Sequence, residues 1–132
     1  MANAAYPLGM QALLNKEFDF DTDNFRCVLV DTGTYTYSSA HMAHADLSGI
    51  VATSGNLTSL SITNGTFDAA DVTFSAVSGN TVEAIVLYHW TGVSTTSKLI
   101  LYLDTGVTGL PVTPNGGDIT ITWNASGIFV LS

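Results

Sequence analysis

Three alternating aspartates near the N-terminus, Asp19, Asp21 and Asp23, are the strongest sign of metal chemistry in this chain. Calcium prefers carboxylate oxygens, and an EF-hand loop begins with this spacing. Such a loop also requires Gly at its sixth position and Glu at its twelfth. Counted from Asp19, those positions hold Asn24 and Val30. The pattern therefore favours a solvated acidic stretch, with a looser calcium site as the weaker alternative.

A second group of potential ligands, His41, His44 and Asp46, would lie together only if this segment formed a helical turn. Imidazole and carboxylate bind zinc, but a structural zinc site needs four ligands. No fourth ligand is evident, and the chain contains no HExxH motif. A polar surface loop is the favoured interpretation. His89, beside Trp90 at the end of an expected strand, is also predicted to be structural.

Sequence motifs give little support to catalysis. Serines are plentiful, but there is no GxSxG motif. A paired-carboxylate hydrolase needs two acids that converge in a cleft, whereas the acidic residues here cluster mainly in one N-terminal stretch. The run Gly116-Gly117-Asp118 follows a proline turn and opens a strand, whereas a phosphate-binding loop opens a helix and contains Lys. We therefore expect a non-enzymatic protein with no catalytic residues, no cofactor and no metal.

The composition predicts a protein that associates with other subunits. Of the 132 residues, 46% are hydrophobic and only 11% are charged, about half the usual charged share. So few charges cover a monomer poorly, which favours burial of some surface in an oligomer over a monomer coated with Ser, Thr and Asn. The net charge of −8 and the scattering of only three basic residues argue against nucleic acid or an anionic membrane as a direct partner.

The single cysteine, Cys27, excludes an intrachain disulfide, and its apolar surroundings predict a buried, inert thiol. The N-terminus lacks the basic region and the long apolar core of a secretory signal, and no apolar run approaches membrane-spanning length. We therefore expect synthesis in the cytoplasm without a membrane anchor.

The fold is expected to be organised around two strands within residues 81–104. Each contains three consecutive apolar residues, Ile85 to Leu87 and Leu99 to Leu101, separated by the polar bend TGVSTTS. A half-exposed strand would alternate strictly between apolar and polar residues, so consecutive apolar residues predict a pair covered on both faces. The second face is expected to be covered by more of the chain or by another subunit.

Further strands are predicted on both sides of this pair, with turn signals every eight to twelve residues. The clearest signals are the Asn64-Gly65 tight turn and the alternating run DITITW at 118–123. Together they predict an all-β fold, a β-sandwich or jelly-roll-like domain of about eight strands with a short N-terminal helix. The whole chain, 1–132, is expected to form this single domain, with 1–16 as a helical arm and 32–48 as an excursion loop that is a candidate contact surface.

The helix is predicted over residues 4–15, with Asn3 as a possible cap and Gly9 as a weakening residue. It either closes an open end of the core, which is favoured, or reaches onto a neighbouring subunit. Large rings dominate both cores and interfaces, so the tryptophans are expected to pack there, and a sugar-binding aromatic platform is the weaker alternative. The predicted partner interface comprises the apolar stripe of the helix and the two tryptophans: Tyr6, Met10, Leu13, Leu14, Trp90 and Trp123.

Three runs resemble a family of small structural proteins from the virions of tailed bacteriophages. They are IVATSGNL (50–57), VTFSAVSGNTVEAIVLY (72–88) and DTGVTGLPVTPNGGDITITW (104–123), and the last is the most specific. The opening MANA before a short apolar helix also looks like that family. The chain departs from it at Pro7-Leu8-Gly9, where charged residues are expected, and the resemblance is weaker over residues 16–49.

The resemblance implies a virion component, with no catalytic residues to carry over. The leading hypothesis is a capsid cement (decoration) protein that oligomerises, as a trimer, and stabilises the shell of the phage major capsid protein. A tail, neck or baseplate protein is the structural alternative, and a carbohydrate-binding adhesion module is the alternative of another class. In each case the location would be the virion after synthesis in the host bacterial cytoplasm.

Overall fold

The computed structural model describes residues 3–19 and 22–130. Its main element is a five-stranded antiparallel sheet with the strand order β1-β8-β7-β2-β3. These strands are β1 (Ala4–Ala5), β2 (Phe25–Val30), β3 (Ile50–Thr53), β7 (Ala84–His89) and β8 (Leu99–Leu103). The two strands expected to organise the fold, β7 and β8, lie side by side within this sheet.

Side chains of the central strands alternate between two apolar clusters, one on each face of the sheet. Cys27, Leu29 and Leu87 belong to the first cluster, and Val28 and Val86 belong to the second. Cross-strand register explains this sorting, because Cys27 lies opposite Leu87 and Val28 lies opposite Val86. The expectation that both faces of the pair are covered is therefore confirmed.

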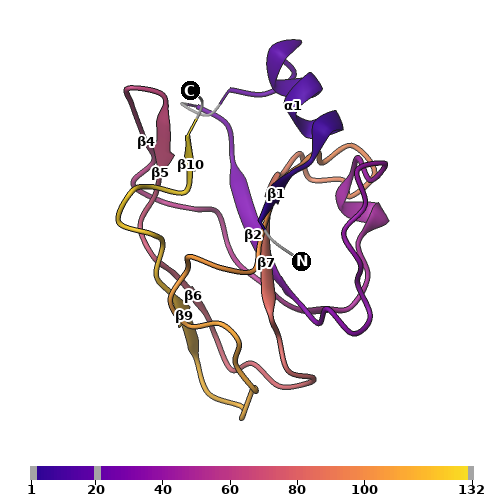
Figure 1. Cartoon of the computed structure of the whole chain (residues 1–132), viewed down its shortest axis with the longest axis vertical. Helices are drawn as coiled ribbons and strands as arrows, with labels where there is room; N and C mark the ends of the chain where they lie inside the picture. Colours follow the sequence, from indigo (N-terminus) through magenta and orange to yellow (C-terminus); the bar gives the residue numbers. More distant parts are fainter. Residues whose placement is uncertain (1–2, 20–21, 131–132) are drawn as a thin grey trace.

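The first face is covered by two small sheets, which lie to the left of the central sheet in Figure 1. One has the order β10-β5-β4, and the other pairs β6 with β9. Apolar side chains from these strands, including Phe67, Phe74 and Ile121, complete the first cluster. The strands are β4 (Ser61–Thr63), β5 (Thr66–Asp68), β6 (Val72–Phe74), β9 (Ile119–Ile121) and β10 (Phe129–Val130).

The second face is covered by the excursion loop at 32–48 and by the N-terminal segment, on the opposite side of the sheet in Figure 1. Tyr35 is 1% exposed, and Tyr37 and Leu47 pack against the same cluster. The loop includes a short 3₁₀ turn at His44–Asp46. The loop therefore serves as part of the core, and no second subunit is required to cover most of this face.

The N-terminal segment packs on its own domain. β1 pairs with the outer edge of β8, and α1 (Pro7–Leu14) follows directly. Tyr6, predicted to lie within the helix stripe, precedes the helix and donates its backbone N–H to the carbonyl of Ile100 at 2.9 Å. Asn3 is not the cap: its side-chain oxygen accepts the backbone N–H groups of Asp104 and Thr105 at 2.7 and 3.0 Å.

The prediction of an all-β fold with a short N-terminal helix is confirmed. The sandwich or jelly-roll assignment is not, because two separate short sheets and loops face the central sheet in place of one continuous second sheet. The described residues form ten strands where about eight were predicted, and two of the ten, β1 and β10, are only two residues long. The Asn64-Gly65 turn is confirmed: both residues have positive φ, 51° and 81°, as a tight hairpin between β4 and β5 requires.

Candidate interaction sites

The apolar stripe predicted on the N-terminal helix is split between core and surface. Tyr6 is fully buried, and Met10 and Leu13 are half-buried against the first cluster. Leu14 is 81% exposed and has the most accessible large apolar side chain of the described residues. Tyr6 therefore has no accessible side-chain surface for a partner, whereas Leu14 presents one.

The two tryptophans belong to opposite faces of the central sheet. Trp123 is 6% exposed in the first cluster, and its indole N–H donates to the carbonyl of Ala70 at 3.0 Å. Trp90 packs beside the second cluster, and the guanidinium of Arg26 lies 4.8 Å from the centre of its ring. The two rings therefore do not share one surface, and Trp123 offers no open face on which a sugar ring could stack.

Several large apolar side chains other than Leu14 are also exposed. On β4, an edge strand, Ile62 is 52% exposed. A hollow of about 370 Å³ lies between α1 and β4, with Leu13, Phe18 and Ile62 among its lining residues. The large apolar residues with more than a third of their surface exposed are Leu14, Met42, Ile50, Ile62 and Val93.

The acidic run and the histidines do not assemble a metal site in the described part of the chain. Asp21 lies outside the described residues, and a carboxylate oxygen of Asp23 accepts the backbone N–H of Asp19 at 2.8 Å. Asp23 also lies 3.3 Å from His89, which packs on Phe18. No group of three or more His, Cys, Asp or Glu side chains is placed to hold a metal ion within residues 3–19 and 22–130.

Each of the three potential zinc ligands weighed in the sequence, His41, His44 and Asp46, has a structural contact instead. A carboxylate oxygen of Asp46 accepts the backbone N–H groups of Met42 and Ala43, which lowers the pKa of Asp46. His41 Nδ1 lies 2.9 Å from the hydroxyl of Tyr35. The ring of His44 packs on Tyr88, and burial lowers the pKa of His44. These contacts fold the excursion loop onto the sheet.

Buried ionisable groups elsewhere are held in their neutral forms. Burial raises the pKa of the Cys27 thiol, which confirms the prediction of a buried cysteine and favours an inert one. Burial raises the pKa of Tyr88 to about 12. Burial also raises the pKa of Tyr6, whose hydroxyl lies 2.7 Å from the hydroxyl of Tyr35. These groups stabilise the core and are not poised for acid–base chemistry near neutral pH.

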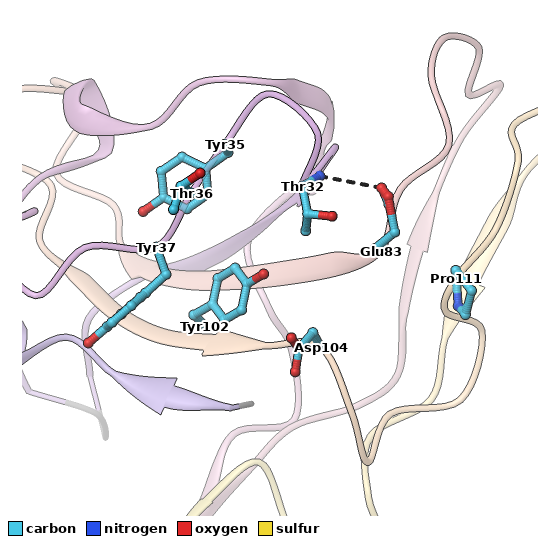
Figure 2. Close-up of a pocket in the computed structure, with 8 residues that line it drawn as sticks. All are labelled: Thr32, Tyr35, Thr36, Tyr37, Glu83, Tyr102, Asp104 and Pro111. Carbon is cyan, nitrogen blue, oxygen red and sulfur yellow. Dashed lines mark hydrogen bonds between the residues drawn. The ribbon is translucent and has the colours of Figure 1, made fainter. Parts of the chain in front are cut away.

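A cavity of about 420 Å³ opens where the excursion loop crosses the start of β7 and the end of β8 (Figure 2). Rings of Tyr35, Tyr37 and Tyr102 form one side of it. Two carboxylates, those of Glu83 and Asp104, lie on the other side. The sequence predicted the excursion loop as a contact surface but did not bring these residues together, since they come from three separate segments.

The run TYTY at 34–37 is the one local signal that sequence analysis could have used for this cavity. Tyr35 and Tyr37 are two residues apart, so in an extended segment they point to the same side. Glu83 and Asp104 have no such signal. They meet because β7 and β8 are antiparallel with Ile85 opposite Leu103, which places the start of one strand beside the end of the other.

Comparison with known proteins identifies no relative: neither the protein-family models nor the curated proteins searched match this chain. Among the helices of the described residues, none has the length and apolar content needed to cross a bilayer.

Proposed function

We propose that the chain is a non-enzymatic structural component of a tailed-phage virion: a capsid cement protein that forms trimers and stabilises the major capsid shell. The proposal is supported by the resemblance of residues 50–57, 72–88 and 104–123 to small virion proteins. In the fold these runs correspond to edge strand β3, to the segment from β6 into β7, and to the loop that leads into β9.

The observation that carries the proposal is the exposure of large apolar side chains on a chain with few charges. Leu14 and Ile62 are 81% and 52% exposed, and only three Lys or Arg residues are present. Complete burial of one such side chain contributes about 1.5–3 kcal/mol. An assembly that covers both side chains would therefore gain a substantial part of its binding free energy from their burial alone.

The hollow between α1 and β4 is the proposed contact region. Leu14 ends α1, while Leu13 and Ile62 line the hollow. β4 is also an edge strand with all three residues exposed, so its backbone can pair with a strand from another chain. Of the interface residues predicted on the helix, Met10, Leu13 and Leu14 thus remain candidates for contact with a partner.

A reconstitution experiment tests the proposal. Phage heads and isolated tails from particles that lack this protein are each mixed with the purified chain, and binding is measured by co-sedimentation. Saturable binding to heads, together with a higher temperature of head disruption, is expected. Leu14→Ser and Ile62→Ser should weaken binding, whereas Thr73→Ser, an exposed change on β6, should not. Binding to tails alone would favour the tail alternative, and binding to neither would contradict a virion role.

A further inference from the structure

One tyrosine hydroxyl that faces the cavity takes part in no hydrogen bond among the described residues. Tyr102 is 2% exposed, and its hydroxyl points into the cavity in Figure 2. It forms no hydrogen bond with any residue in the described ranges 3–19 and 22–130. Because this hydroxyl faces the cavity, a ligand can donate a hydrogen bond to it without breaking one within the fold, and such a bond contributes about 0.5–1.5 kcal/mol.

The other two tyrosine hydroxyls are used within the fold and hold the cavity in shape. Tyr37 donates its hydroxyl to the carbonyl of Ala5 at 2.6 Å, away from the cavity. The hydroxyl of Tyr35 lies 2.7 Å from the hydroxyl of Tyr6 and 2.9 Å from Nδ1 of His41. Because these rings are anchored at their far ends, the aromatic wall is formed before a ligand arrives, which lowers the entropic cost of binding.

The charge in the cavity selects a cation. Glu83 and Asp104 place two carboxylates at its edge, and both contribute, after burial, to raising the pKa of Tyr102. Among the described residues, the Glu83 carboxylate accepts one long hydrogen bond, 3.3 Å, from the backbone N–H of Thr32. An anionic ligand would be repelled by both groups, whereas a cation would be attracted.

The walls favour an organic cation over a metal ion. Calcium requires six to eight oxygen ligands, and the cavity offers two carboxylates. The rings of Tyr37 and Tyr102 lie 5.7 Å apart between centroids, and those of Tyr35 and Tyr102 lie 6.3 Å apart, so they form one continuous aromatic surface. A guanidinium or alkylammonium group gains cation–π attraction and apolar contact from such a surface. A volume of about 420 Å³ accommodates a group of that size.

We propose that this cavity binds a guanidinium or alkylammonium group, which donates a hydrogen bond to the Tyr102 hydroxyl and lies against the Glu83 and Asp104 carboxylates. The group can belong to an Arg or Lys side chain of a partner protein or to a free polyamine. This proposal is independent of the virion role, because it rests only on the cavity.

Titration of the ¹⁵N-labelled protein with three probes tests the proposal: blocked arginine amide, blocked lysine amide and spermidine, with sodium chloride as the ionic-strength control. We expect saturable shifts of the backbone amide signals of Thr32, Glu83 and Tyr102 at probe concentrations of about 10 mM, ten times a millimolar Kd. Tighter binding of a blocked amino acid would identify a partner side chain as the source, and tighter binding of spermidine would identify a free amine. Absence of saturable shifts with all three probes would overturn the proposal.

Matched variants separate this site from general attraction to an acidic protein. Glu83→Gln should weaken binding about tenfold, whereas Glu17→Gln removes the same charge outside the cavity and should leave binding unchanged. Tyr102→Phe should weaken binding about fivefold, whereas Tyr88→Phe removes a tyrosine hydroxyl that does not line the cavity and should leave binding unchanged. The spectrum of each variant reports whether it is folded. An equal loss in Glu83→Gln and Glu17→Gln would also contradict the proposal.

Discussion

Gly9→Ala should destabilise the protein, although alanine is the better helix former. A Cβ atom at residue 9 would lie 1.7 Å from the carbonyl oxygen of Leu99 and 2.9 Å from its carbonyl carbon. Because Cβ atoms essentially never approach another atom within 3.0 Å, α1 would have to move away from β8 by about 1.3 Å. The hydrogen bond from the Tyr6 N–H to Ile100 lies at this junction and would be strained as well.

The two effects on the free energy of unfolding have opposite signs. Replacing Gly by Ala within a helix stabilises by about 1 kcal/mol. Overpacking against a backbone costs about 1–3 kcal/mol, and a weakened backbone hydrogen bond costs about 1 kcal/mol. The clash dominates, so we expect a net loss of about 1–3 kcal/mol. Urea unfolding, followed by far-ultraviolet circular dichroism, measures this difference.

Gly55→Ala is the matched control. A Cβ there meets no atom within 4 Å, and Gly55 does not have a positive φ. Its unfolding free energy should therefore change by less than about 0.5 kcal/mol, or rise slightly because the unfolded chain becomes less flexible. If Gly9→Ala were as stable as the wild type, the docking of α1 on β8 would be refuted.

Three other predictions concern the core and the loops. Cys27 should not react with a thiol reagent at pH 8 in the folded protein and should react fully in urea, because burial raises its pKa; rapid reaction of the native protein would contradict its burial. Gly65→Ala should cost about 1 kcal/mol in urea unfolding because its φ is 81°, whereas Asn64→Gly should be tolerated; equal stabilities would argue against this turn. Burial lowers the pKa of both His44 and His89, so protonation favours the unfolded state: stability should be fully present above pH 6.5 and fall as the pH drops below it, and His44→Gln with His89→Gln should flatten that dependence. A urea midpoint that stays constant between pH 7 and pH 5 would contradict the last prediction.

The sequence predicted those parts of the fold that depend on local pattern. Consecutive apolar residues such as Ile85 and Val86 predicted a strand covered on both faces, because side chains alternate across a sheet. Asn64-Gly65 predicted its hairpin, because only residues that tolerate positive φ fit such a turn. The burial of Cys27 followed from its apolar neighbours.

Contacts between distant segments could not be predicted in this way. Gly9 looked like a defect in a helix, and only the carbonyl of Leu99 explains why a larger residue is excluded there. Tyr6 looked like an interface residue because its apolar ring fits the helical stripe, whereas its hydroxyl bonds to Tyr35 inside the core. The cavity around Tyr102 depends on strand register and loop placement, which a single sequence does not specify.

The central claim, that this chain is a structural part of a virion head, is tested most directly by a cryo-electron microscopy map of the intact particle. Such a map reports location, stoichiometry and contacts together. We predict density for the domain on the outer head surface, in three copies around contacts between major capsid proteins, with α1 and β4 facing a neighbouring chain. Density only at the tail would contradict the cement role, and a particle with no such density would contradict a virion role altogether.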